Sequence, residues 1–165
     1  TWTSVGLMGA TAAVAGQNLG AGHPDRSVHA VKVASRIGLV LAVIFGAFYL
    51  AIPRALLGFF GVDDPLVVEM GVELLAYLSV SGLFITVALA YTGGLQGTGD
   101  TRSPFFISII SQMVVPLGIC AVLQATTGLE ARDIWLAIVL GHMTRCALTV
   151  IRFRQGKWRT IRVNA

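Results

Sequence analysis

Charged side chains are scarce in this sequence, and their scarcity excludes an ordinary soluble domain. Asp, Glu, Lys and Arg make up only 12% of the 165 residues, whereas a soluble domain carries about 25%. Hydrophobic residues make up 55%, and the mean hydropathy is +0.78. Because so few polar side chains are available to cover an apolar surface, the composition predicts an integral membrane protein.

Cysteine is also rare, which removes disulfide and metal frameworks from consideration. Cys120 and Cys146 each stand alone within an apolar run, without a CxxC partner or a neighbouring set of ligands. We interpret both as small packing residues. The sequence also lacks the cluster of Asp, His or Glu that a membrane-embedded enzyme would need, so we expect neither an enzyme, nor a cofactor, nor a metal site.

Long apolar runs are abundant, and each is long enough to cross the roughly 30 Å of a bilayer as a helix. They do not alternate as the strands of a membrane barrel would, and a helix satisfies its own backbone hydrogen bonds in lipid. The sequence therefore predicts an all-α, polytopic bundle of five membrane helices. The predicted spans are residues 1–17, 33–52, 72–95, 104–125 and 134–151.

The first run is not typical of a signal peptide, because it has no basic flank, no initiator Met and no cleavage site. Together with the odd number of spans, this start leads us to expect a fragment of a longer protein.

Positive charge is unevenly distributed between the loops. When the spans are laid out alternately, ten of the twelve Lys and Arg residues fall on one side, and only Arg54 and Arg132 fall on the other. The positive-inside rule then places the C-terminus and the loop around Arg102 in the cytoplasm. We interpret the basic tail, residues 154–165, as a cytoplasmic anchor beside anionic lipid, with Trp158 at the interface, and not as a nucleic-acid patch.

The stretch LQGTGDTRSP, residues 95–104, invites comparison with a phosphate-binding loop. It lacks the Lys of the GxxxxGK[ST] pattern, and no β-strand precedes it. We therefore predict a short cytoplasmic turn between two spans. Gly97 and Gly99 would supply positive φ angles, Ser103 would cap the next helix, and Asp100 would pair with Arg102 near the positive end of that helix.

Polar side chains inside the spans are the candidates for a transport cavity, because they are costly in hydrocarbon. In the fourth span, Ser108, Ser111 and Gln112 are spaced i, i+3, i+4 and would share a face. Pro116 follows one turn later and should kink the helix. This polar stripe is our first choice of site, and the alternative is a set of hydrogen bonds between helices.

Two further groups are weaker candidates. Tyr77 and Tyr91 lie on one stripe of the third span, where aromatic faces could bind an organic cation or simply pack in the core. His142 lies well inside the fifth span, where it could exchange a proton near neutral pH or be a satisfied structural residue. Arg145, three residues later, could snorkel toward the cytoplasm.

Three motifs carry a resemblance to a known family. These are AGQNLGAGHPDRS after a Gly/Ala-rich helix, FFGVDDPLVVEMGVELLAYL, and LQGTGDTRSP. Together, in this order and spacing, they resemble the multidrug and toxic compound extrusion (MATE) transporters, which have twelve helices in two six-helix lobes. The resemblance implies that residues 1–153 correspond to helices eight to twelve, which form most of the C-terminal lobe. The first helix of that lobe and the N-terminal lobe would lie outside this chain.

The resemblance implies a secondary active antiporter that exports organic cations or drugs in exchange for H⁺ or Na⁺. Its partners would be the lipid bilayer, the organic cation and the N-terminal lobe, with no nucleic acid. Its place would be the plasma (inner) membrane, with a cytoplasmic C-terminus. Two alternatives stay open: a flippase of lipid-linked oligosaccharides from the same superfamily, and a structural membrane subunit without transport activity.

The sequence departs from the sodium-coupled bacterial branch of that family, which has an acidic residue inside the third of these helices. Here that helix carries only Glu73, at its outer end. The coupling carboxylate would then belong to the parts of the transporter outside this chain.

Overall fold

The computed structural model describes residues 2–161, and this part of the chain consists of helices joined by short turns and loops, without a strand. The all-α prediction is therefore confirmed. The helices are α1 (Trp2–Gly20), α2 (Pro24–Ala51), α3 (Pro53–Phe59), α4 (Pro65–Gly97), α5 (Arg102–Ile109), a π-helical segment (Ile110–Val114), α6 (Val115–Thr126), α7 (Ala131–Arg154) and a 3₁₀ turn (Lys157–Thr160).

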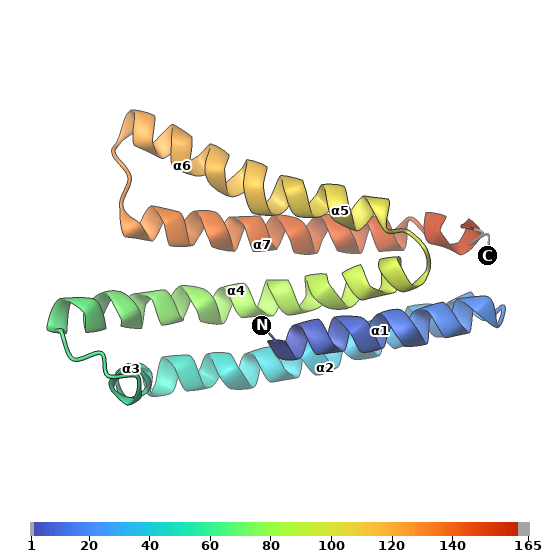
Figure 1. The fold of residues 1–165 in the computed structure, drawn as a ribbon, viewed down its shortest axis with the longest axis horizontal. Helices are drawn as coiled ribbons and strands as arrows, with labels where there is room; N and C mark the ends of the chain where they lie inside the picture. Colours follow the sequence, from blue (N-terminus) through green and yellow to red (C-terminus); the bar gives the residue numbers. More distant parts are fainter. Residues whose placement is uncertain (1, 162–165) are drawn as a thin grey trace.

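The longest helix, α4, lies in the middle of the bundle (Figure 1). Helices α1 and α2 pack against one side of it, and α7 packs against the other. Helices α5 and α6 cover α7 from outside, and α5 also contacts α4. The central position of α4 explains why it contributes side chains both to the buried core and to the cavity between the helices.

Within residues 2–161, four stretches are long and apolar enough to cross a membrane: α2, α4, residues 102–126 from α5 through α6, and α7. The membrane bundle is thus confirmed, but the predicted number of five spans is one too high. The first predicted span forms α1, a helix of 19 residues. Its mean hydropathy is lowered by Ser, Thr and Gly residues and above all by Gln17 and Asn18, so it does not join the four.

Large apolar side chains on the outside of the bundle fit a lipid environment. Val40, Phe48 and Leu117 are among many that are more than half exposed. In water, such a continuous apolar surface would lead to association. In a bilayer, it is the surface that contacts the lipid chains.

The loops group at two ends of the bundle, as the charge pattern predicted. The α1–α2 turn, the α4–α5 turn and the C-terminal segment lie at one end, which we call the basic end (Figure 1). The α2–α3–α4 connection and the α6–α7 loop lie at the other. There, Arg132 Nε of α7 is 2.7 Å from Glu73 Oε1 of α4, and this ion pair joins the two helices.

Glycines allow α1 to approach α4 with its backbone. A Cβ added at Gly16 would lie 2.6 Å from the carbonyl oxygen of Gly97. A Cβ at Gly97 would meet the carbonyl oxygen of Ala12, and one at Gly93 would meet that of Met8, both at closer range. The close packing of α1 on α4 therefore depends on glycine, which has no side chain, at these three positions, as in other closely packed membrane helices.

Candidate functional site

A cavity of about 670 Å³ lies between α1, α2, α4 and α7 and reaches the π-helical segment. This volume is within the range of small-molecule sites, about 300–1,000 Å³. Much of its wall is apolar, with Leu, Ile and Phe side chains from α2 and α4. Its polar lining beyond α1 consists of Tyr49, Ser79, Ser81, Thr86, Gln112, His142 and Arg145. None of the residues that line it is Asp or Glu.

The structure brings together two of the predicted cavity residues, Gln112 and His142. The other predicted cavity residues lie outside the lining: Ser108, Ser111, Tyr77 and Tyr91. The role of each of these residues in transport stays a prediction. The contacts that each one makes are described below.

Ser111 and Gln112 are neighbours in the π-helical segment, but their side chains have different surroundings. Ser111 is fully buried and its hydroxyl donates a hydrogen bond to the carbonyl oxygen of Ile107 at 2.6 Å, whereas Gln112 is exposed and lines the cavity. Consecutive residues of a helix point about 100° apart, so one of these two neighbours can face the bundle while the other faces the cavity. The spacing had predicted one shared face.

The irregularity ends next to Pro116, the residue for which a kink was predicted. The backbone N–H of Val115 donates to the carbonyl oxygen of Ile110, five residues back. Pro116 has no N–H to donate, and its ring faces Gly141 of α7, where an added Cβ would lie 3.0 Å from Pro116 Cγ. A glycine on α7 therefore makes room for the proline and for the wider turn before it.

The two tyrosines of α4 contact aromatic residues at the two ends of α7. The rings of Tyr77 and Trp135 are tilted, with centroids 5.8 Å apart. Tyr91 is buried and meets Phe153 edge to face at 5.3 Å. Both contacts favour the packing interpretation over a face for an organic cation.

His142 and Arg145 differ in how well they are paired. A hydrogen bond joins His142 Nδ1 to Ser81 Oγ of α4. Arg145 lines the same cavity, but its Nε is buried without a hydrogen-bond partner among residues 2–161. Arg145 precedes Arg152 by seven residues, which places it about 10 Å deeper in the bundle at 1.5 Å per residue. An unpaired charge at this depth is costly.

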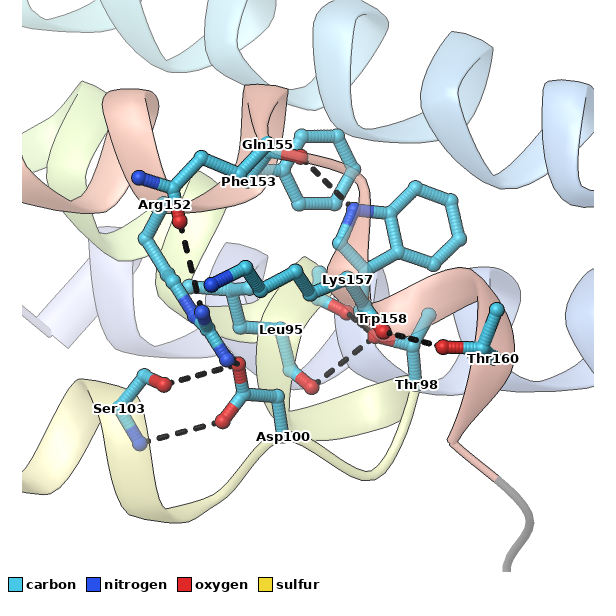
Figure 2. A network of polar contacts seen from close by, with 11 residues as sticks. Leu95, Thr98, Asp100, Ser103, Arg152, Phe153, Gln155, Lys157, Trp158 and Thr160 are labelled. Atoms are coloured by element: carbon cyan, nitrogen blue, oxygen red, sulfur yellow. Dashed lines mark hydrogen bonds and ion pairs between the residues drawn. The ribbon is translucent and has the colours of Figure 1, made fainter.

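At the basic end, Asp100 is the centre of a polar network (Figure 2). One carboxylate oxygen accepts a hydrogen bond from the backbone N–H of Ser103 at 3.1 Å, and the other accepts from the Ser103 hydroxyl at 2.9 Å. Arg152 of α7 donates to the same carboxylate through Nε, at 2.8 Å, and lies as close through Nη2. The prediction that Asp100 pairs with Arg102 was wrong. Arg102 is exposed, and the ion pair of Asp100 is formed with Arg152.

This network changes the acidity of Asp100. Burial alone would raise the pKa of its carboxyl group, but the hydrogen bonds from Ser103 and Arg152 and the charge of Arg152 outweigh burial. The pKa of Asp100 therefore lies below its ordinary value. The carboxylate stays ionised and ties the α4–α5 turn to the end of α7.

Two details of the predicted turn also need correction. Only Gly99 has a positive φ, of 93°, whereas Gly97 is the last helical residue of α4 and is needed for the close approach of α1. Ser103 does not cap α5 from outside, because α5 begins at Arg102. The acceptor that a cap normally provides comes from Asp100.

The C-terminal segment folds back onto the bundle. Trp158 is only 1% exposed, stacks on Phe153 with centroids 4.9 Å apart, and donates from Nε1 to the carbonyl oxygen of Phe153 at 2.8 Å. Arg159 Nη2 is 3.1 Å from Asp25 Oδ1 of α2. The prediction of Trp158 at the lipid interface was therefore wrong. The end of the predicted tail, residues 162–165, lies outside the described residues.

Gly156 is the sequence signal for this reversal. It follows Gln155, the residue that caps the end of α7, and has a φ of 70°, a conformation that glycine adopts readily and that often ends a helix. The apolar Trp two residues later could then turn back onto the helix. Among residues 2–161, no group of three or more His, Cys, Asp or Glu side chains could hold a metal ion.

Comparisons with known proteins agree with this geometry. The sequence model of the MatE family matches residues 1–122. The probable multidrug resistance protein NorM of Deinococcus radiodurans is 29% identical over 151 residues, which are 89% of this chain and 33% of that protein. Protein DETOXIFICATION 36 of Arabidopsis thaliana is 25% identical over 155 residues, 94% of this chain and 31% of that protein.

A solved structure has the same fold. The crystal structure of the eukaryotic MATE transporter AtDTX14 matches with a TM-score of 0.83 at 21% identity, over 94% of this chain and 35% of that chain. The chain thus spans about a third of the length of the relatives that it matches.

Proposed function

Since the chain belongs to the MatE family, we propose that it forms most of one six-helix lobe of a secondary active efflux transporter. Residues 1–153 would form the lobe, and residues 154–165 would form its cytoplasmic tail. The rest of the transporter, including the N-terminal lobe, would come from outside residues 1–165. Proteins named for multidrug resistance among the relatives support drug export as the activity.

The cavity with Gln112 and His142 is the observation that carries this proposal. Secondary transporters bind their substrates near the middle of the membrane, at an interface between repeats and beside helices that are not continuous. This cavity lies next to the π-helical segment that divides the Arg102–Thr126 stretch. It combines an apolar wall with a few polar groups, as a site for amphiphilic compounds requires.

The exported compounds would be organic cations or drugs, exchanged for H⁺ or Na⁺ without a cofactor. His142 is the candidate in this chain for carrying a proton, because imidazole titrates near neutral pH. A Na⁺ site would need carboxylates, which the lining of the cavity lacks. The lobe would lie in the plasma (inner) membrane with its basic end in the cytoplasm, as its excess of Lys and Arg favours.

The test is transport by the full-length protein in proteoliposomes. We expect an imposed proton or sodium gradient to drive a fluorescent organic cation against its concentration gradient. The chain of residues 1–165 alone should give no driven transport, because alternating access needs two halves that move around a shared site. Driven transport by this chain alone, or none by the full-length protein with either ion, would contradict the proposal.

A further inference from the structure

Arg145 lacks a counter-charge in the described part of the protein. Its Nε is buried without a partner, and the residues that line its cavity include no carboxylate. Three other arginines are paired with acids at the ends of the bundle: Arg152 with Asp100, Arg159 with Asp25, and Arg132 with Glu73. Arg145 differs from these three, and it is the one that faces the cavity.

Arg145 is partly buried, and its buried Nε has lost the water that would otherwise solvate it, so an anionic oxygen is the partner that suits this guanidinium. Its planar fork matches a carboxylate or a phosphate, with two parallel hydrogen bonds. The neighbouring groups suit the same ligand. Gln112 offers amide donors, and His142 is held in place by its hydrogen bond to Ser81.

We propose, on the basis of the transport function above, that this cavity receives an acidic group of the transported compound and that Arg145 binds it. The substrate class is then an amphiphile with a carboxylate or phosphate, either as an acid or as a zwitterion. The Leu, Ile and Phe side chains of the wall bind its apolar body. An organic cation without an acidic group gains nothing from Arg145 and is bound by the apolar wall and the other polar side chains of the cavity.

The test uses pairs of compounds that differ at one group only. Full-length protein in proteoliposomes is given an amphiphilic amino acid and its methyl ester, and the KM for driven transport is measured for each. The variants are Arg145→Gln, which removes the charge, and Arg145→Lys, which keeps a point charge without the fork. Arg154→Gln is the matched control, because Arg154 is exposed at the end of the same helix.

We expect Arg145→Gln to raise the KM for the acid about ten- to hundredfold, the usual range for a lost hydrogen bond to a charged group. The KM for the ester should change less than twofold, Arg145→Lys should recover part of the loss, and Arg154→Gln should match the wild type. If Arg145→Gln raises the KM for the acid and the KM for the ester equally, the inference is overturned, and Arg145 instead pairs with an acidic residue elsewhere in the transporter. The inference would also be overturned if the ratio of the two KM values, acid to ester, were the same in Arg145→Gln as in the wild type. If the wild type transports neither compound nor any organic cation, the proposed function itself fails.

Discussion

Asp100 shows how one side chain can join three elements. Its carboxylate accepts from Ser103 at the start of α5 and from Arg152 at the end of α7, and it follows directly on the turn after α4 (Figure 2). The side chain is 5% exposed, so water cannot replace these partners. The α4–α5 turn and the end of α7 are therefore held as one unit at the basic end.

Asp100→Asn in the full-length protein should destabilise this end by about 1–3 kcal/mol, the cost of losing hydrogen bonds to a charged group. Because the pKa of Asp100 is lowered from its ordinary 3.8, the carboxylate adds stability that is fully present above pH 3.8 and is lost as the pH falls through the lower, folded value. The measurement is the midpoint of thermal unfolding in detergent at neutral pH and at acid pH.

The wild type and Asp100→Asn should differ at neutral pH and converge in strong acid. Arg102→Gln, which removes an exposed charge from the same turn, should leave the midpoint unchanged. A midpoint equally sensitive to Arg102→Gln and to Asp100→Asn would show that net charge matters there, and not the ion pair.

Gln112 is the residue of the predicted polar stripe that reaches the cavity. Gln112→Leu keeps most of the volume and removes the hydrogen-bonding groups, so we expect the relative export rates of several substrates to change by severalfold. The protein should still reach the membrane, since buried polar contacts there average only about 0.6 kcal/mol. Efflux rates for a panel of drugs, normalised to protein level, give the measurement.

Gln124→Leu is the matched control, because Gln124 is exposed near the far end of α6 and does not line the cavity. If Gln112→Leu leaves every rate at the wild-type value, Gln112 plays no part in substrate binding.

At the scale of elements, the contact between α1 and α4 depends on backbone touching backbone. Gly16, Gly93 and Gly97 each face a carbonyl oxygen or backbone of the other helix, with no space for a methyl group. A backbone carbonyl cannot move aside as a flexible side chain can. The two helices would have to separate along the whole contact to admit even one Cβ.

Gly97→Ala should therefore destabilise the lobe by about 1–3 kcal/mol or more, the usual cost of overpacking. Gly82→Ala on the same helix is the control, because a Cβ there meets nothing within 4 Å. Alanine is also the better helix former by about 1 kcal/mol, so Gly82→Ala should be neutral or slightly stabilising. Unfolding midpoints of the purified proteins compare the two, and equal effects would contradict the tight contact.

At the scale of the molecule, the bundle has a basic end and an opposite end where α3 and the α6–α7 loop lie (Figure 1). Ser103 lies at the basic end, and Asp64 caps α4 at the other, where its carboxylate accepts from the N–H of Leu66 at 2.9 Å. These two positions should therefore face opposite sides of the membrane.

We expect Ser103→Cys to react from the cytoplasmic side and Asp64→Cys from the outside. Each is made after Cys120 and Cys146 are replaced by Ala, and is tested with a thiol reagent that does not cross the membrane. The cysteine-free protein measures the background. Reaction of both positions from one side would contradict the topology, and reaction from inverted sides would contradict the assignment of the basic end to the cytoplasm.

The sequence by itself determined the class of protein and most of its helix ends. Scarce charge and long apolar runs indicate a membrane bundle, since apolar side chains can face lipid and a helix satisfies its own backbone hydrogen bonds there. Local chemistry placed a turn at Gly99, because glycine adopts positive φ angles readily wherever it occurs. Three motifs were enough to suggest the family that the comparisons then showed.

Only the tertiary structure decided which residues meet. Arg102 and Arg152 carry the same charge, and nothing local indicates that the end of α7 reaches Asp100 first. Trp158 follows a helix in a basic tail, a typical interface position, yet it is buried because Gly156 turns the chain back onto Phe153. A change in helical period is equally invisible in spacing: the π-helical segment packs against α7 where Gly141 leaves space for the carbonyl oxygen of Ser111 and for the ring of Pro116. Partners distant in sequence are set by the packing of whole helices, and a local pattern cannot contain that information.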